Sequence, residues 1–214
     1  MLGPGVEGGS PPGATGRGPE VKRNAPRVEY PFLIAGLGNP GPRYADTRHN
    51  AGFQVLDRVS KLFGLEFRPG AGRWLEANGG RGDGQYSLLK PLTYMNLSGD
   101  AVAAVAERRG IGPERILVVC DDLDLSLGRI RIRRGGSSGG QKGLRSILDR
   151  LETNDVPRLR IGVGPRTGDT VDFVLSPFEK DENNQALELF DRAADAVLEI
   201  LESGLDAAMT RFNG

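Results

Sequence analysis

Apolar residues along this chain fall into two patterns, short continuous runs and longer segments whose apolar positions recur at helical spacing. Four runs predict buried strands, at 32–35, 86–89, 116–120 and 159–163. Four amphipathic segments predict helices, at 53–63, 101–109, 144–151 and 187–201. Strands that alternate with helices predict an α/β fold, a single globular domain whose mixed, mostly parallel sheet is flanked by helices.

A fifth strand is predicted where arginine and isoleucine alternate. Arg129, Arg131 and Arg133 are separated by single isoleucines. Because successive side chains of a strand point to opposite faces, one face of this strand is apolar and the other is basic.

The net charge of zero conceals a strong charge asymmetry. Residues 129–166 contain ten cationic and three acidic residues, whereas 167–214 contain three cationic and eleven acidic residues. Screening confines surface electrostatics to about 10 Å, so a local basic stretch attracts phosphate even in a neutral chain. The charge pattern therefore allows a nucleic-acid partner.

The first 28 residues differ from the rest in composition. They contain seven glycines, five prolines and no aromatic residue. Such a segment cannot bury enough apolar surface to offset its ordering entropy, so we predict a disordered extension over 1–28 and a globular domain over 29–214. The segment lacks the apolar core of a secretory signal, and Glu7, Glu20 and the prolines disfavour an amphipathic transit peptide.

The chain has one cysteine and one histidine, His49, and no run close to the ~18 apolar residues that a membrane span needs. One cysteine excludes an internal disulfide framework and fits a reducing compartment. A single cysteine and a single histidine also exclude a Cys/His zinc cage, which needs four ligands. Any reaction step that uses an imidazole must therefore use His49.

Three short motifs resemble known sites but fail in context. The segment 36–41 matches the dinucleotide fingerprint G-x-G-x-x-G, yet Pro40 and the late start of helical periodicity disagree with a helix that begins inside the motif, which disfavours a nucleotide-binding oxidoreductase. The segment 136–140 matches the hydrolase elbow G-x-S-x-G, but His49 precedes the serine instead of following it. Cys120 ends a buried run, where a cysteine is more often a small core residue than a nucleophile.

Polar residues that suit hydrolysis follow three of the predicted strands. They lie in predicted loops at 38–50, 93–96 and 121–124. Because ligand sites of open α/β sheets gather at the carboxyl ends of strands, we expect these loops to converge. Together they offer one imidazole, a carboxylate and two carboxamides, a set that can activate a water molecule and polarise a carbonyl group.

Structural alternatives stay open for single members of this set. Asn50 and Asn96 precede predicted helices and suit N-caps. Asp122 and Asp124 suit turns.

Several longer segments, taken in order, are similar to the motifs of one known family. They are Leu33-Ile34-Ala35-Gly36-Leu37-Gly38-Asn39-Pro40-Gly41, Thr47-Arg48-His49-Asn50-Ala51-Gly52, Met95-Asn96-Leu97-Ser98-Gly99 and Asp121-Asp122-Leu123-Asp124-Leu125. On these segments the chain, from about Pro31 to its last residue, resembles the bacterial-type peptidyl-tRNA hydrolase family. The resemblance implies an enzyme that hydrolyses the ester between a peptide and the 3′ ribose of tRNA, which recycles tRNA from stalled translation.

The resemblance also implies roles for individual residues. His49 matches the family's catalytic base and Asp121 the acid that orients it. Asn39 and Asn96 match the amides that position the water and the peptide carbonyl. The other residues implied to contact the substrate are Tyr44 and Met95 at the reaction site, and Arg133 and Arg160 at the tRNA 5′-phosphate.

Two neighbouring residues depart from the family's pattern. Gln141 and Lys142 stand where the family commonly has His and Asn. That Asn is associated with substrate binding, so we expect Lys142 to contact acceptor-stem phosphates instead, as a point charge.

The family implies a cytoplasmic monomer that needs no cofactor, no metal and no stable protein partner. Its substrate is bound through the acceptor stem, the 5′-phosphate and the 3′ peptidyl end. The alternative is a non-catalytic RNA-binding relative of the same fold. The joint presence of His49, Asp121, Asn39 and Asn96 favours the enzyme, since a protein that only binds RNA does not need them.

Overall fold

The computed structural model describes residues 1, 3, 33–81, 84–164 and 169–214. The extension predicted over 1–28 lies outside this part of the chain, apart from residues 1 and 3.

Within the described residues, seven strands form one sheet in the order β2-β3-β4-β1-β5-β7-β6. The strands are β1 (Leu33–Gly36), β2 (Arg68–Pro69), β3 (Trp74–Arg81), β4 (Gly84–Pro91), β5 (Ile116–Ser126), β6 (Ile130–Arg133) and β7 (Arg158–Gly164). The central strands β4, β1, β5 and β7 are parallel, and β3 and β6 pair antiparallel with β4 and β7. The mixed sheet with a parallel centre is confirmed.

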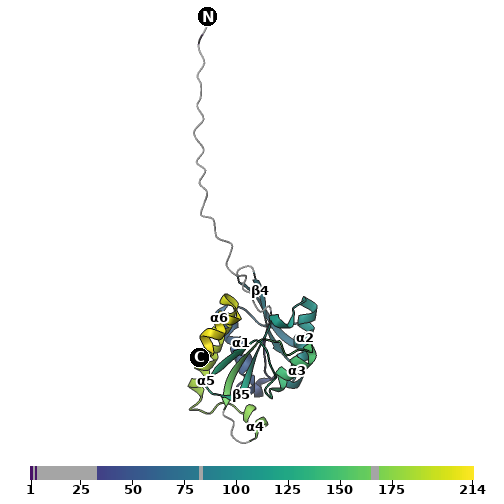
Figure 1. Ribbon diagram of the computed structural model, residues 1–214, viewed down its shortest axis with the longest axis vertical. Helices are drawn as coiled ribbons and strands as arrows, with labels where there is room; N and C mark the ends of the chain where they lie inside the picture. Colours follow the sequence, from purple (N-terminus) through teal and green to yellow (C-terminus); the bar gives the residue numbers. More distant parts are fainter. Residues whose placement is uncertain (2, 4–32, 82–83, 165–168) are drawn as a thin grey trace.

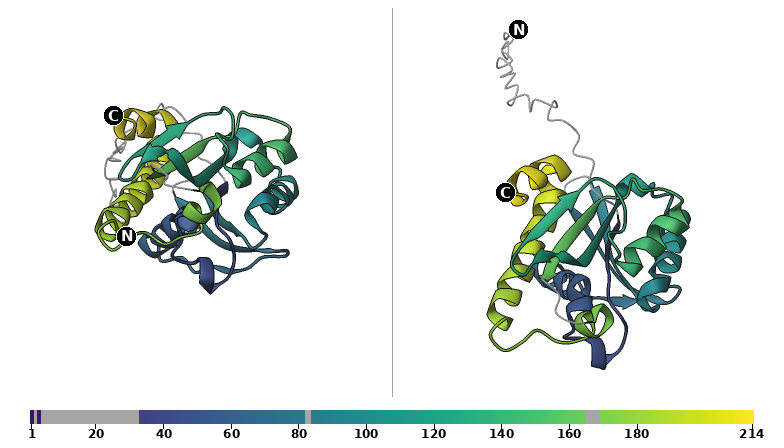
Figure 2. Two further views of the ribbon diagram at one scale, coloured as in Figure 1. Left: turned by 90° about the horizontal axis from the view of Figure 1, so that it is seen from below. Right: turned by 60° about the horizontal axis from the view of Figure 1, so that its bottom comes forward.

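Helices cover both faces of the sheet (Figure 1). They are α1 (Ala51–Leu62), α2 (Ser98–Arg109), α3 (Lys142–Leu151), α4 (Thr170–Val174), α5 (Asn183–Ser203) and α6 (Leu205–Phe212). The α1, α5 and α6 helices pack on one face, and α2 and α3 pack on the other. Figure 2 shows the long α5 helix and the α2–α3 pair on opposite sides of the sheet, so the domain has three layers.

The β5 strand is apolar along its first half because both of its faces are covered. Leu117 and Val119 pack toward α1 and α5. Ile116, Val118 and Cys120 pack toward α2 and α3. Cys120 is therefore a core residue, as predicted, and burial raises the pKa of its thiol.

Two glycines allow α1 to lie directly against the sheet. A Cβ atom on Gly52 would come within 2.3 Å of the Val119 carbonyl oxygen, and one on Gly36 would come within 2.6 Å of the Gly52 carbonyl oxygen. No other residue fits such contacts. Gly36 belongs to the fingerprint-like segment 36–41, and its role here is close packing of strand and helix, since α1 begins only at Ala51.

A side chain occupies the backbone groups of one residue on the β6 edge of the sheet. Asn213, which follows α6, accepts a hydrogen bond from the Ile132 N–H at 2.7 Å and donates one to the Ile132 carbonyl at 3.0 Å. Ile132 is buried, while Arg131 and Arg133 on either side of it are exposed. The predicted alternation of apolar and basic faces is confirmed.

Some details of the sequence prediction are wrong. The segment 121–124, predicted as a loop, belongs to β5, because pairing with β7 continues to Asp122 opposite Gly162. Neither Asn50 nor Asn96 caps a helix through its side chain: Asn50 bonds elsewhere, and Asn96 lies inside a 3-10 turn. The β3 strand lacks apolar alternation, and α4 and α6 are short, so none of the three has a counterpart in the prediction.

Candidate active site

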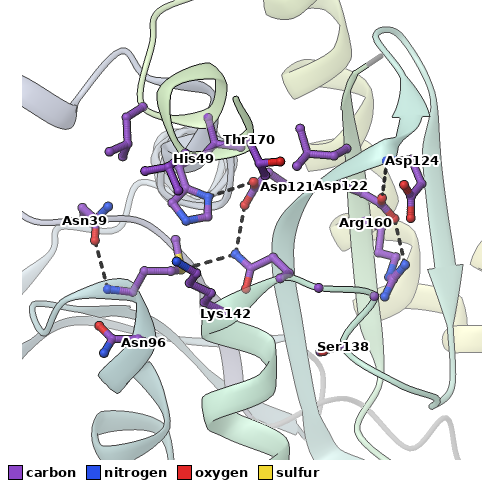
Figure 3. A pocket seen from close by; sticks show the side chains of 18 of the residues that line it. Asn39, His49, Asn96, Asp121, Asp122, Asp124, Ser138, Lys142, Arg160 and Thr170 are labelled. Atoms are coloured by element: carbon purple, nitrogen blue, oxygen red, sulfur yellow. Dashed lines mark hydrogen bonds and ion pairs between the residues drawn. The ribbon is translucent and has the colours of Figure 1, made fainter. Parts of the chain in front are cut away.

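A cavity of about 1070 Å³ opens at the carboxyl ends of the parallel strands. Its walls come from the loop after β1, the 3-10 turns η2 (Arg48–Asn50) and η3 (Met95–Leu97), the second half of β5, Arg160 of β7, the loop residues 138–140, the start of α3, and α4. Figure 3 shows side chains from these elements gathered around one space. The three polar segments that were predicted to converge therefore do so.

His49 and Asp121 form a buried pair in the cavity wall (Figure 3). His49 Nδ1 lies 2.8 Å from Asp121 Oδ2, and the two side chains are 11% and 3% exposed. A carboxylate only accepts hydrogen bonds, so Nδ1 donates, and in the neutral imidazole Nε2 then carries the lone pair. The pair therefore presents a basic nitrogen suited to proton transfer.

Asn39 offers hydrogen-bond donors beside this pair. Its Oδ1 accepts from the Met95 backbone N–H at 2.9 Å. Asn50 holds its backbone, because Asn50 Oδ1 accepts from Asn39 N at 2.8 Å and Asn50 Nδ2 donates to Asn39 O at 3.0 Å. Since Oδ1 is occupied, the Nδ2 hydrogens are what Asn39 can present to a carbonyl group or an oxyanion.

The η3 turn supplies a second wall. Met95 is buried and Asn96 is exposed, and both line the cavity. Tyr94, which is 60% exposed, adds an aromatic ring to the lining. The turn thus combines an amide with apolar surface.

The α4 helix supplies an apolar wall that is tied to the segment carrying His49. Its contribution to the cavity comes mainly from Val171, Val174 and Leu175. Arg48 is 2% exposed, and its guanidinium lies 4.4 and 4.9 Å from the ring centres of Phe173 and Phe178. It also forms an ion pair with Glu182. The wall and the His49 segment are therefore held together by one buried side chain.

A second charged pair lies on the other face of β5. Successive residues of a strand alternate, so Asp121 faces His49 while Asp122 faces Arg160 (Figure 3). The Arg160–Asp122 distance is 2.9 Å, and the side chains are 15% and 6% exposed. Asp122 also accepts from the Asp124 N–H at 2.9 Å, which is the turn-type bond considered above.

Arg133 lies near Arg160 in the sheet but does not line the cavity. The register places Arg131 opposite Arg160 and Arg133 opposite Arg158. Residues directly opposite in an antiparallel pair share a face, so four arginines lie on one face of the sheet. Arg131 and Arg133 are exposed, and Arg158 is buried.

Arg158 stabilises the loop between β6 and α3. It is 1% exposed, and burial lowers the pKa of its guanidinium. It donates to four backbone carbonyl oxygens at 2.7–3.3 Å, those of Val156, Gly136, Ser137 and Asn154. One of the ten cations counted over 129–166 is thus engaged inside the protein.

Of the two remaining predicted site residues, Lys142 lines the cavity and Tyr44 does not. Lys142 is the first residue of α3, and its exposed side chain lines the cavity. Tyr44, predicted to line the site, lies in the 3-10 turn η1 (Pro42–Tyr44) outside the cavity lining, where Arg43 donates to its hydroxyl.

Sequence reasoning missed two parts of the cavity. It noted Gln141 as a departure from the family's pattern but did not predict that Gln141 donates a hydrogen bond to Asp121. The α4 wall could have been found from Asp169, whose carboxylate accepts from the Val171 and Asp172 N–H groups and caps the helix.

Among the described residues, no group of three or more His, Cys, Asp or Glu side chains is placed to hold a metal ion. In the same part of the chain, no helix has the length and apolar character needed to cross a bilayer.

Comparisons with known proteins agree with one another. A family model described as peptidyl-tRNA hydrolase matches residues 33–214. The peptidyl-tRNA hydrolase of Moorella thermoacetica is 49% identical over 185 residues, which cover 85% of this chain and 97% of that protein. That of Caldanaerobacter subterraneus is 47% identical over 86% of this chain and 100% of its own length. The crystal structure of peptidyl-tRNA hydrolase from Acinetobacter baumannii gives a TM-score of 0.81 at 34% identity and covers 87% of this chain and 96% of that one.

Proposed function

Since the chain belongs to the peptidyl-tRNA hydrolase family, we propose that His49, Asp121 and Asn39 carry out its reaction. That reaction is hydrolysis of the ester between a peptide and tRNA, which frees the tRNA for reuse. The observation that carries the assignment of residues is the 2.8 Å bond between His49 and Asp121 in the cavity wall. The similar proteins are hydrolases by name, which does not favour the non-catalytic RNA-binding alternative.

The proposed mechanism begins with a water molecule held at His49. Nε2 takes a proton from the water, whose oxygen attacks the ester carbonyl carbon. Asp121 accepts the Nδ1–H bond throughout and stabilises the imidazolium that forms. The bond to the 3′-oxygen then breaks, and that oxygen receives the proton from Nε2. The products are a peptide carboxylic acid, which releases its proton to water and becomes a carboxylate, and a tRNA with a free 3′-hydroxyl group.

Asn39 and Asn96 are proposed to hold the ester carbonyl group and the attacking water in place. Asn39 Oδ1 accepts from the Met95 N–H, so its Nδ2 hydrogens are proposed to donate to the oxygen that becomes negative during attack. Asn96 is exposed on η3 and is proposed to position the substrate, together with Met95. Tyr44 lies outside the cavity lining, so its proposed contact is with substrate beyond the cavity.

The proposed route for the tRNA runs over the basic face. Arg160 of β7 lies in the cavity wall, and Arg133 is exposed on the neighbouring strand β6. The two side chains can therefore bind a 5′-phosphate between them. Lys142 lines the same cavity as His49 and Arg160. Because the substrate is made wherever ribosomes translate, we place the reaction in the cytoplasm.

The function is tested by incubating the protein with N-acetyl-aminoacyl-tRNA in the presence of EDTA. We expect multiple-turnover release of the N-acetyl amino acid and intact tRNA. Retention of tRNA on a filter without any release would contradict the proposal and point to the RNA-binding alternative.

Replacing Lys142 should weaken substrate binding more than it slows the reaction. We expect Lys142→Ala to raise KM roughly 3- to 10-fold, in the range of a typical net hydrogen-bond contribution of about 0.5–1.5 kcal/mol, and to leave kcat within about 2-fold. Arg145→Ala, one turn further along α3 and outside the cavity lining, is the matched control. An unchanged KM with a lower kcat would place Lys142 in the chemical step instead.

A further inference from the structure

Gln141 lies where three elements of the active site meet. It directly precedes α3, and its Nε2 donates to Asp121 Oδ1 of β5 at 3.0 Å. The same nitrogen lies 3.3 Å from the Met95 Sδ of η3. Its Oε1 accepts from the Leu144 N–H at 2.7 Å and caps the helix. One side chain thus contacts the strand, the turn and the helix.

These contacts fix the orientation of the Gln141 amide. A carboxamide has one acceptor oxygen and one donor nitrogen. If the amide were flipped, its oxygen would face Asp121 Oδ1, and two acceptors would meet. The Leu144 N–H would at the same time lose its partner. Only the observed orientation satisfies both neighbours.

The Asp121 carboxylate is held at both oxygens as a result. Oδ2 accepts from His49 and Oδ1 accepts from Gln141. Figure 3 shows dashed lines reaching Asp121 from two sides. A carboxylate bonded at one oxygen can rotate about its Cβ–Cγ bond, whereas one bonded at both oxygens keeps its plane. The second bond therefore preserves the line between Oδ2 and Nδ1.

The position of Gln141 is itself fixed by close packing. Gly143 lies two residues further on, and a Cβ atom there would come within 2.4 Å of the Met95 Sδ and 2.9 Å of a Leu37 methyl group. The start of α3 is thus packed against η3 and the end of β1. This packing holds the Gln141 side chain within reach of Asp121.

We propose that Gln141 is a positioning residue for the hydrolysis, which acts by holding the Asp121 carboxylate in the plane that orients His49. The proposal rests on the function and the His49–Asp121 roles given above. Gln141, which stands where the family commonly has His, thereby has a defined role in the site. Gln141 acts through Asp121 and takes no proton itself.

Three substitutions separate this role from helix capping. Gln141→Ser keeps a good N-cap for α3 but is too short to reach Asp121. Gln141→Leu loses both bonds. Gln141→Glu keeps the capping oxygen and places a second acceptor against Asp121. Arg145→Ala, exposed on the same helix, is the control for general disturbance of α3.

We expect kcat to fall in every variant that loses the hydrogen bond to Asp121, whether or not that variant keeps the helix cap. We expect kcat to fall about 10-fold in all three variants with KM within 2-fold of the wild type, since a hydrogen bond to a charged group is lost. Thermal stability should fall for Gln141→Leu, which loses the helix cap, and for Gln141→Glu, whose carboxylate repels that of Asp121, but not for Gln141→Ser. Because His49 is the only histidine, its imidazole nitrogens give single assignable NMR signals. The Nδ1–H signal should weaken through faster exchange in the Ser and Glu variants.

The outcome that overturns the proposal is a Gln141→Ser variant with wild-type kcat and an unchanged Nδ1–H signal. In that case the side chain would serve only as a helix cap. A wild-type protein that releases no amino acid would instead refute the function, so the two failures are distinguishable. Equal losses of stability in all three variants, with kcat lost in proportion, would also count against a positioning role.

Discussion

His49→Ala should lower kcat for release of an N-acetyl amino acid from tRNA by about 10²–10⁴-fold, the typical contribution of a general base. His49 is the only imidazole of the chain, so no neighbouring histidine can take over the proton. The substrate should still bind, because the arginines of the basic face are untouched. Single-turnover rates measured at saturating enzyme test this, since they report the chemical step alone.

Cys120→Ala is the matched control, because a thiol paired with the histidine is the competing assignment. Cys120 is 1% exposed and packs with α2 and α3 in the core. We expect kcat within about 2-fold of the wild type and a stability loss of about 1 kcal/mol from the lost packing. A His49→Ala variant with near-wild-type turnover would refute the general-base assignment.

Arg158→Met should be the most destabilising of the arginine substitutions on the β6–β7 face. The guanidinium is buried and donates to four backbone carbonyl oxygens, and each buried carbonyl left without a partner costs about 1–3 kcal/mol unless water reaches it. We expect the free energy of unfolding to fall by about 3–5 kcal/mol. Thermal denaturation should show this as a Tm lower by roughly 10 °C.

Arg131→Met is the control for the loss of positive charge. It removes a cation from the same face of the sheet, but from an exposed position opposite Arg160. We expect stability to change by no more than about 0.5 kcal/mol and the KM for tRNA substrates to rise. If the two variants proved equally stable and equally impaired in tRNA binding, Arg158 would be a tRNA contact and not a loop support.

The central sheet and part of the site could be predicted because their signals are local. The run 116–120 is apolar at every position, and both of its faces are covered in the structure. His49 and Asp121 were candidates because polar residues that follow buried strands end at one edge of the sheet. Those inferences need only the sequence neighbours and the general geometry of α/β folds.

The remaining features depend on contacts between distant parts of the chain. Arg158 and Arg160 are two residues apart on one face of β7, and nothing in the alternation says which is buried. The difference arises because four backbone carbonyl groups from two loops surround the Arg158 guanidinium, whereas Arg160 donates to one of them and to Asp122. Gln141 and Asp121 are likewise 20 residues apart, and only the packing of α3 against η3 brings them together.

The two hydrogen bonds between Asn213 and Ile132 of β6 affect how this protein can interact with other molecules. An exposed strand edge is a template on which a second chain can add a strand, and such pairing leads to aggregation. Here the amide group of one side chain occupies the donor and the acceptor of Ile132 that an incoming strand would need. Ile132 at the centre of the arginine-bearing β6 edge is therefore unavailable for β-pairing, while Arg131 and Arg133 on either side of it stay exposed. Copies of the protein that gather on a polyanion thus cannot pair strands at this residue.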